Sequence, residues 1–267
     1  MKDLEDKAAF VTGAASGIGR AIANSLARAG VAVAVADIDA SAAEKASRDI
    51  EAAGGRAVAV ACDVTSEASL EGAVDAAGEA LGPIQLLVNN AGGFAASPLE
   101  QTQRRDWEWL LELNVLGVVN GLHTFLPRMR AHGGECHIVN TASVSGHIPT
   151  PNLSIYTASK FAVVGLSEVL RLELTGSPIG VSVLCPGIVK TDLLETSRRH
   201  RSERHGGSEA GTGVEMGAVI ETGTDPAELG EQVIAGIVAG DFYIFTHAGV
   251  RPALEQRFQA ILAEYRS

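Results

Sequence analysis

The sequence predicts an α/β fold in which one doubly wound, mostly parallel sheet of seven strands carries helices on both faces. Three observations lead to this prediction. Short apolar runs of strand length alternate with longer stretches of helical pattern along the chain. Most of the apolar runs lack apolar/polar alternation, which is typical of strands buried on both faces of a parallel sheet. No linker or shift in composition divides residues 1–267, so we expect a single domain.

The predicted strands and helices follow one another as a Rossmann-type sheet with right-handed crossovers requires. Strands are predicted at residues 8–12, 31–37, 57–62, 84–89, 136–140, 181–185 and 242–246. Helices are predicted between them at residues 18–29, 41–53, 66–81, 102–130, 154–174 and 226–239.

One segment, residues 190–223, departs from this alternation because it has no strand pattern. It holds a glycine-rich run at 206–217, preceded by a basic cluster of Arg198, Arg199, His200, Arg201, Arg204 and His205. A loop of this length is commonly functional or disordered. It follows the carboxyl end of a strand, where open α/β sheets bind ligands, so we interpret it as a substrate loop or lid. A solvated, partly helical insertion is the alternative.

Composition excludes several classes of protein. The chain has 21 Lys and Arg against 32 Asp and Glu, a formal net charge of −11, which argues against nucleic acid as a partner. No run approaches the length of a membrane span, and the charged N-terminus lacks the apolar core of a signal peptide. Three cysteines (Cys62, Cys136, Cys185) have no metal-ligand spacing. We therefore expect a soluble, cytoplasmic protein with reduced thiols and no metal.

The first strand runs into a glycine-rich turn at residues 12–20. Glycine permits a tight turn and close approach of a pyrophosphate, and the following helix N-terminus offers free N–H groups and a partial positive charge. A glycine triplet is a weak signal in a chain with 30 glycines, but its place between a strand and a helix strengthens it. The predicted coenzyme-binding residues of this turn are Gly13, Ser16, Gly17, Ile18 and Gly19.

The second predicted strand ends at Asp37, which indicates the choice of coenzyme. A carboxylate there accepts hydrogen bonds from the adenosine ribose hydroxyls. It also repels a 2′-phosphate, by on the order of a few kcal/mol at an effective dielectric constant of about 20. The neighbouring positions that could carry a phosphate-binding cation, Ser16 and Ile38, are not basic. We therefore predict NAD rather than NADP; an ordinary turn aspartate is the alternative interpretation.

Two further strand ends contribute predicted coenzyme contacts. After the third strand, Asp63 with its neighbour Val64 is placed to reach the adenine edge, although Asp63 could equally cap the helix that starts near Ser66. After the fourth strand, the sequence Asn-Asn-Ala-Gly supplies Asn90, Ala91 and Gly92. Small residues leave room for the coenzyme there, and the amides are able to hold the sheet edge together; the sequence does not separate these two roles.

Tyr156 and Lys160 are one helical turn apart, so a helix places them on one face. A free tyrosine titrates at about 10, too high for a base at neutral pH. A neighbouring ammonium group and an oxidised nicotinamide both lower the pKa of the phenol, which lets Tyr156 exchange a proton with a substrate hydroxyl. Ser143, at the end of the fifth strand, is placed to hydrogen-bond the substrate oxygen. Each residue has an ordinary structural interpretation alone; together with the glycine turn they predict a catalytic site.

Taken together, the glycine turn, the Asn-Asn-Ala-Gly sequence, Ser143 and the pair Tyr156 and Lys160 resemble the compact, NAD-dependent branch of the short-chain dehydrogenase/reductase family over about residues 5–195. The resemblance implies an enzyme that oxidises a CH–OH group or reduces the ketone. It implies catalytic roles for Ser143, Tyr156, Lys160 and Asn114, which would distort its helix and hold a water that relays protons to Lys160. Nicotinamide and ribose contacts would come from Tyr156, Lys160, Pro186, Gly187, Ile188 and Thr191.

The resemblance also implies a homodimer or homotetramer built on the predicted helices 102–130 and 154–174. Many members end with a glycine-rich stretch around a final strand, which completes a tetramer interface. This chain ends instead with an aromatic strand at 242–247 and then with Arg251 and Pro252 at the start of a helix. The departure puts the usual tetramer in doubt and favours a dimer.

The predicted substrate pocket is mostly apolar, which indicates a hydrophobic secondary alcohol or ketone, such as an aryl, alicyclic or steroid-like one. His147 either contacts a polar substrate group or is a loop histidine without a role. The basic cluster is either solvated or attracts a carboxylate, a CoA thioester or an acyl carrier. The walls are predicted to be the 190–223 loop with Gly93, Phe94, Val144, His147, Ile148, Pro149, Asn152 and Ile188.

Two alternative functions stay open. A 3-oxoacyl-thioester reductase would be expected to carry a basic residue that favours NADP, and none stands next to Asp37. A non-catalytic dinucleotide-binding sensor would be free to lose the acid/base pair, whereas Ser143, Tyr156 and Lys160 are all present in this chain.

Overall fold

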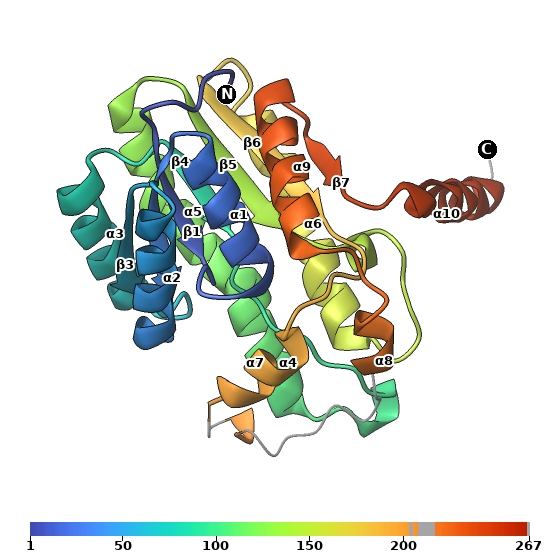
Figure 1. Cartoon of the computed structure of the whole chain (residues 1–267). Coiled ribbons are helices and arrows are strands. Elements are labelled where there is room, and N and C mark those ends of the chain that lie inside the picture. Colours follow the sequence, from blue (N-terminus) through green and yellow to red (C-terminus); the bar gives the residue numbers. More distant parts are fainter. Residues whose placement is uncertain (203–204, 208–216, 266–267) are drawn as a thin grey trace.

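The computed structural model describes residues 1–202, 205–207 and 217–265. Within them, seven strands form one parallel sheet in the order β3-β2-β1-β4-β5-β6-β7, which confirms the predicted doubly wound fold (Figure 1). The strands end within two residues of their predicted bounds and are β1 (Ala8–Thr12), β2 (Ala32–Asp37), β3 (Ala57–Ala61), β4 (Leu86–Asn89), β5 (Cys136–Thr141), β6 (Ile179–Cys185) and β7 (Tyr243–Phe245).

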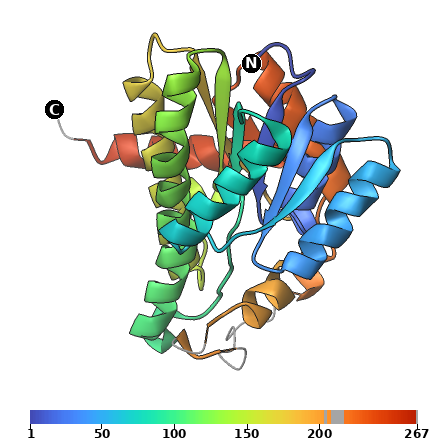
Figure 2. The same cartoon turned by 90° about the vertical axis from the view of Figure 1, so that its left-hand side faces the viewer.

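Helices cover both faces of the sheet, and each face has its own apolar core (Figure 2). One face carries α1 (Gly17–Arg28), α2 (Ala40–Ala52) and α9 (Pro226–Ala239). The other carries α3 (Glu67–Leu81), α4 (Arg104–Leu111), α5 (Gly117–His132) and α6 (Ser154–Glu173). The fully buried strand residues Phe10 and Val11 belong to opposite cores, which explains why β1 shows no apolar/polar alternation.

The long helix that the sequence predicts at 102–130 is interrupted. α4 continues through a π-helical turn, Glu112–Leu116, into α5. The stretch Arg104–His132 has the length of a membrane-crossing helix, and its most apolar 18 residues have a mean hydropathy of 1.2, but more than half of that part is buried inside the protein. Its contacts with β4, α3 and α6 are those of a core helix.

The described part of residues 190–223 contains two helices, α7 (Leu193–Arg199) and α8 (Gly217–Ile220), and no strand. The two ends of the segment lie side by side, because Lys190 N donates to the Thr224 carbonyl oxygen and Thr224 N to that of Ile188, both at 3.0 Å. Arg204 and most of the glycine-rich run at 206–217 lie outside the described residues.

The C-terminal end leaves the body of the protein. β7 is the outermost strand of the sheet, and a short 3₁₀ turn, Ala248–Val250, joins it to α10 (Arg251–Ala263). α10 projects away from the sheet and its covering helices (Figure 1). None of the residues of this helix is buried.

Candidate active site

A cavity of about 800 Å³ opens at the carboxyl edge of the sheet. Residues that follow six of the strands line it, together with residues of α4, α6 and α7 and of the π-helical turn. The predicted site residues in its lining are Gly13, Ser16, Gly17, Ile18, Asp37, Asp63, Val64, Asn90, Ala91, Gly92, Gly93, Ser143, Tyr156, Lys160, Pro186, Gly187 and Thr191. The predicted site residues outside its lining are Gly19, Phe94, Asn114, Val144, His147, Asn152 and Ile188.

The glycine-rich turn after β1 has a backbone that a ligand can approach closely. Gly13 and Gly17 have φ angles of +63° and +53°, in the left-handed region that favours glycine. A Cβ atom on Gly19 would lie 2.2 Å from the Gly13 carbonyl oxygen, so only glycine lets α1 pack on the turn. Ser16 is the N-cap of α1, and its side chain makes no capping hydrogen bond. Because the first N–H groups of a helix lack intrahelical acceptors, this part of the cavity fits a pyrophosphate.

The amides after β4 hold the sheet edge together. Asn90 Nδ2 donates to the Thr12 carbonyl oxygen at 2.9 Å, and the Thr12 hydroxyl oxygen accepts hydrogen bonds from the N–H groups of Asn90 and Ala91, also at 2.9 Å. Asn89 Nδ2 donates to Asn140 Oδ1 on the neighbouring strand at 2.9 Å. The asparagine side chains therefore fix the edge, while the small Ala91 leaves room in the cavity.

Asp37 lies where β2 ends and accepts two backbone hydrogen bonds. Its Oδ2 accepts from Ala15 N in the glycine-rich turn at 3.0 Å, and its Oδ1 accepts from Asp39 N at 3.1 Å. Beside it, Ile38 also lines the cavity and is half exposed. The carboxylate thus links β2 to the glycine-rich turn and faces the cavity at the same time.

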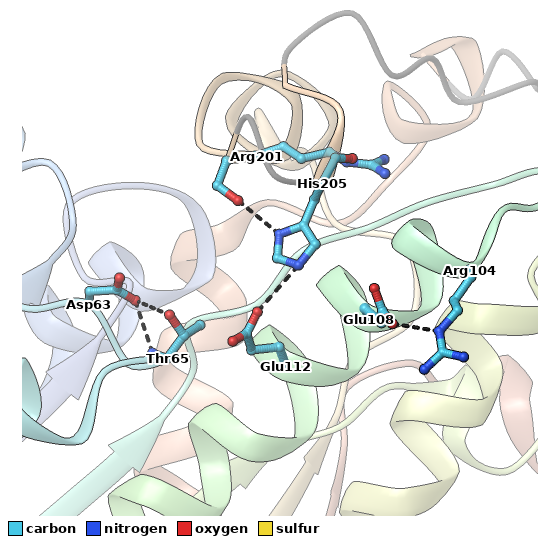
Figure 3. A network of polar contacts seen from close by, with 8 residues as sticks. Asp63, Thr65, Arg104, Glu108, Glu112, Arg201 and His205 are labelled. Atoms are coloured by element: carbon cyan, nitrogen blue, oxygen red, sulfur yellow. Dashed lines mark hydrogen bonds and ion pairs between the residues drawn. The ribbon is translucent and has the colours of Figure 1, made fainter.

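Asp63 has a local partner as well as a place in the cavity. Its Oδ1 accepts hydrogen bonds from the Thr65 N–H at 2.9 Å and the Thr65 hydroxyl at 2.7 Å (Figure 3). The helix that follows is capped by Ser66, whose side chain accepts from Ser69 N. Asp63 therefore shapes the turn before α3 rather than capping the helix itself.

Ser143, Tyr156 and Lys160 meet in the cavity. Ser143 follows β5, accepts a hydrogen bond from Ser145 N at 3.1 Å and donates to the Pro186 carbonyl oxygen at 3.3 Å. Tyr156 and Lys160 come from the first two turns of α6, with Lys160 Nζ 5.6 Å from the centre of the tyrosine ring.

Burial sets the protonation of this pair in the protein without coenzyme. It raises the pKa of Tyr156, and a hydrogen bond with the Ser143 hydroxyl offsets this only in part. It lowers the pKa of Lys160 to about 8, because the buried ammonium group is poorly solvated. Lys160 Nζ donates to the Thr141 carbonyl oxygen at 3.0 Å. The expectation that Lys160 and an oxidised nicotinamide together lower the pKa of Tyr156 concerns the complex with coenzyme, and it stays a prediction.

Asn114 lies on the π-helical turn, at the point where the family resemblance implies a distorted helix. It is buried, and its Oδ1 accepts from Gly93 N at 2.7 Å. Its Nδ2 donates to the Gly93 carbonyl oxygen at 3.1 Å and to Ser159 Oγ at 3.0 Å. Asn114 therefore fixes the backbone after β4 against α6, next to the cavity rather than in its lining.

The lining also includes side chains that the sequence did not indicate, and several of them pack in the same apolar clusters as Tyr156. Trp109, Glu112 and Leu113 come from the end of α4 and the π-helical turn, and Leu193 and Ser197 come from α7. The π-helical turn changes which residues of this helix face inward, so the regular 3.6-residue period could not identify them.

Of the eight residues predicted for the wall, seven lie outside the cavity lining, Ile148, Pro149 and Ile188 among them. Phe94 packs against the Tyr156 ring with centroids 4.8 Å apart, and Asn152 lines a neighbouring hollow. Val144 and His147 lie outside the cavity. His147 is buried, with Nε2 3.3 Å from Cys185 Sγ and its ring against the aromatic residues of β7. The prediction that His147 contacts the substrate is therefore replaced by the other interpretation: its side chain packs against β6 and β7 and does not line the cavity.

The segment after α7 is fastened to α4. Arg201 is buried; its guanidinium lies 4.7 Å from the Trp109 ring, pairs with Asp106 and donates to the His205 carbonyl oxygen at 2.7 Å. His205 Nε2 lies 3.5 Å from Glu112 Oε2 on the π-helical turn (Figure 3). The sequence left two interpretations of the basic cluster open, a solvated cluster or one that attracts an acidic substrate. For Arg201 the structure shows neither, because its guanidinium is buried against α4.

No metal site or disulfide forms in the described part of the chain. The three cysteines are free and buried. Among the residues that the structure describes, no group of three or more His, Cys, Asp and Glu side chains is arranged to hold a metal ion.

A doubly wound sheet with a glycine-rich turn, and a serine, tyrosine and lysine in the same cavity, defines a dinucleotide-binding oxidoreductase. Comparison with known proteins gives the family: a sequence model described as short chain dehydrogenase matches residues 7–202. The chain belongs to the short-chain dehydrogenase/reductase family.

Relatives match over nearly the whole chain. It is 35% identical to a CLA biosynthesis dehydrogenase/reductase of Lactiplantibacillus plantarum, over 99% of this chain and 96% of the relative. It is 34% identical to a C alpha-dehydrogenase of a Sphingobium species, over 98% of this chain and 87% of that one. A crystal structure of a short chain dehydrogenase/reductase from Burkholderia phymatum in complex with NAD is similar to it with a TM-score of 0.93 and 34% identity, covering 100% of this chain and 98% of the other.

Proposed function

We propose that this chain transfers a hydride between NAD and a hydrophobic secondary alcohol or its ketone, with Tyr156 as the acid/base. The observation that carries the proposal is the convergence of Ser143, Tyr156 and Lys160 in the cavity that also contains the glycine-rich turn and Asp37. When bound there, NAD supplies the nicotinamide carbon that accepts or gives the hydride. Membership of the family and the dehydrogenase names of the relatives support the reaction class.

Each catalytic side chain has one task in this proposal. The Ser143 hydroxyl hydrogen-bonds the substrate oxygen and keeps it beside Tyr156. Tyr156 takes the hydroxyl proton during oxidation and returns it during reduction. The positive charge on Lys160 Nζ favours the phenolate. Because burial alone raises the pKa of Tyr156, the phenol ionises most readily in the complex that also contains the positive charge of the oxidised coenzyme.

The preference for NAD over NADP rests on Asp37. Its carboxylate stands at the end of β2 and is held by Ala15 N, so it cannot swing away from the cavity without losing that hydrogen bond. A 2′-phosphate beside it would bring like charges together. Ile38, the next residue, offers no cation to offset them.

The proposed substrate class rests on the apolar part of the cavity lining near Tyr156. Trp109, Leu113 and Leu193 present apolar surface to the cavity, and Glu112 and His205 supply polar contacts farther along it. A substrate with an apolar body fits this wall.

A single comparison tests the proposal: the formation of reduced nicotinamide, followed by its absorbance, with wild type and with Tyr156→Phe. The substrates are aliphatic, aryl, alicyclic and steroid alcohols, each with NAD⁺ and with NADP⁺. We expect turnover with NAD⁺ on one bulky class, and a loss of at least about 100-fold in Tyr156→Phe, as removal of a general acid/base produces. Coenzyme affinity, measured by tryptophan fluorescence, should stay unchanged.

The same experiment distinguishes the alternatives. Turnover with a 3-oxoacyl thioester and not with the alcohols would favour a thioester reductase. Coenzyme binding without turnover on any substrate of the set would favour a sensor. Equal turnover by wild type and Tyr156→Phe would reject the proposed role of the tyrosine.

We also propose a cytoplasmic location. All three cysteines are free and buried, which suits a compartment that keeps thiols reduced.

A further inference from the structure

His247 follows the last strand, β7, and the proposed function gives it no task. It lies beyond residue 202, where the match to the family's sequence model ends. β7 pairs in parallel with β6, so the residues that follow the two strands leave the sheet side by side at its carboxyl edge (Figure 1). His247 therefore stands next to the segment 186–191, which follows β6 and contributes to the cavity lining Pro186, Gly187, Val189 and Thr191.

Each nitrogen of the His247 ring contacts a backbone group of this segment. Gly187 N donates to Nδ1 at 3.0 Å, and Nε2 lies 2.9 Å from the Ile188 carbonyl oxygen. A backbone N–H only donates and a carbonyl oxygen only accepts. One neutral form of the ring therefore satisfies both contacts, with the proton on Nε2 and the free electron pair on Nδ1.

The ring also occupies the place that a side chain on Gly187 would need. A Cβ atom there would lie 2.8 Å from Cγ and 2.9 Å from Cδ2 and Nδ1 of His247. Only glycine lets the imidazole pack so closely against this backbone. Gly187 lines the cavity and His247 does not, so the ring supports this part of the cavity wall from its outer side.

The same stretch of chain is bonded to two other parts of the site. The Pro186 carbonyl oxygen accepts hydrogen bonds from Val144 N at 2.8 Å and from the Ser143 hydroxyl at 3.3 Å. His247 Nε2 lies 3.0 Å from the hydroxyl oxygen of Thr224, the residue that follows the segment 190–223. His247 thus connects the end of β7 with the chain on both sides of that segment.

We propose that His247 is a positioning residue for the coenzyme. The inference rests on the proposed function, which takes Pro186 and Gly187 as contacts of the nicotinamide. Without the ring, the Gly187 N–H loses its acceptor and the glycine backbone gains conformational freedom. The apparent affinity for the coenzyme then falls in proportion to the fraction of molecules that keep the binding conformation. His247 therefore controls the affinity for NAD and the alignment of hydride transfer from outside the cavity.

Three variants of His247 separate its two contacts. His247→Phe keeps a ring of similar size and removes both hydrogen bonds. His247→Asn offers an acceptor oxygen at the place of Nδ1, and His247→Gln offers a donor near the place of Nε2. The matched control is His132→Phe, the same substitution at an exposed histidine in the last turn of α5. Thermal unfolding verifies that each variant is folded.

The first readout is the dissociation constant for NAD⁺, measured by tryptophan fluorescence without substrate, so it does not depend on turnover. We expect it to rise at least about 5-fold in His247→Phe and His247→Gln, and to stay within about 2-fold of wild type in His247→Asn and in the control. Hydrogen exchange of the segment 186–191 without coenzyme should show a Gly187 amide that is protected in wild type and His247→Asn and unprotected in the other two His247 variants.

The second readout separates positioning from a general loss of structure. With the alcohol that wild type oxidises best, kcat of His247→Phe should fall at least about 10-fold, and by more than KM for the alcohol rises. The deuterium isotope effect on kcat with the carbinol-deuterated alcohol should increase, because a misaligned nicotinamide slows hydride transfer and leaves the other steps unchanged. His247→Asn should recover most of kcat.

The outcomes distinguish this inference from the proposed function. Failure of wild type to bind NAD⁺ would reject both. If wild type binds NAD⁺, unchanged affinity in His247→Phe, or equal weakening in His247→Asn and His247→Phe, would overturn the positioning role alone. Binding of NAD⁺ without turnover on any alcohol would reject the proposed reaction, and the affinity and exchange measurements would still decide the role of His247.

Discussion

Lys160 is a buried cation, and its cost to the stability of the fold is measurable. Its side chain is only 5% exposed and donates one hydrogen bond, to the Thr141 carbonyl oxygen. We predict that Lys160→Met, which replaces the ammonium group with an apolar side chain of similar length, makes the coenzyme-free protein more stable at pH 7 while abolishing turnover.

The magnitude follows from the pKa. Burial lowers the pKa of Lys160 from 10.5 to about 8. At about 1.4 kcal/mol per pKa unit, the charged lysine costs the folded state about 3 kcal/mol at pH 7. Lys160→Met removes this cost, but it also removes the hydrogen bond to the Thr141 carbonyl oxygen, which lowers the free energy of unfolding by about 1 to 2 kcal/mol. The net expectation is a free energy of unfolding that is higher by about 1 to 2 kcal/mol in Lys160→Met.

The sign of the pH dependence follows from the same numbers. The folded pKa of Lys160 lies below the unfolded one, so between pH 8 and 10.5 the unfolded chain binds more protons than the folded protein. The cost is therefore fully present below pH 8 and declines as the pH rises toward 10.5. At pH 9.5 the free-energy cost of the charged lysine is about half as large as at pH 7. The free energy of unfolding of Lys160→Met should then be nearly equal to that of wild type.

The assay is urea unfolding of wild type and variant at pH 7 and pH 9.5, without coenzyme and at one fixed protein concentration, because assembly also affects stability. The matched control is Lys190→Met, the same substitution at an exposed lysine, which should change the free energy by less than about 0.5 kcal/mol at both pH values. A Lys160→Met protein less stable than wild type at pH 7, or an advantage that does not shrink with pH, would refute the reasoning.

Three further predictions concern the cavity. The double variant Asp37→Ser with Ile38→Arg should shift the ratio of kcat/KM for NADP⁺ over NAD⁺ upward by at least about 100-fold, since it removes a repulsive charge and adds an attractive one; an unchanged ratio would show that Asp37 does not select the coenzyme. Asn114→Ala leaves the buried polar groups of Gly93 without their partner and should lower the free energy of unfolding by about 2 to 3 kcal/mol, measured with urea; full stability would contradict the positioning role. Arg201→Met removes the contacts of the segment after α7 with α4, so it should raise KM for the alcohol several-fold while the thermal midpoint stays within a few degrees of wild type. An unchanged KM would mean that these contacts do not shape the pocket.

Much of the fold was predictable because burial leaves a direct trace in the sequence. β1 lies between two apolar cores, so each of its residues is apolar or small, and the same holds for its neighbours in the sheet. The glycine-rich turn was recognisable for a similar reason, since a Cβ on Gly19 would collide with Gly13. Tyr156 and Lys160 were recognisable because helical spacing alone places them on one face.

The remaining parts depend on contacts between distant segments. Arg201 looked like a loop cation, yet its partner Asp106 lies 95 residues earlier in the chain, and no local pattern announces that pair. His147 lies close to Ser143 in sequence, but its ring packs against β7 instead of the cavity. The helix at the C-terminus could be recognised from its pattern, whereas its direction away from the body could not.

Because of the π-helical turn at Glu112–Leu116, the geometry of the site is sensitive to the loss of a single residue at this point of the chain. Such a turn accommodates a single extra residue in an otherwise regular helix. Deleting one residue there would let the helix run on without interruption, and everything before it would rotate by about 100° about the helix axis relative to α5. Trp109 would leave the cavity wall and Asp106 would leave the reach of Arg201, while the strands stayed as they are. A change of one codon in length would thus alter the cavity wall and the contact of the segment after α7 with α4 together, without any substitution at Ser143, Tyr156 or Lys160.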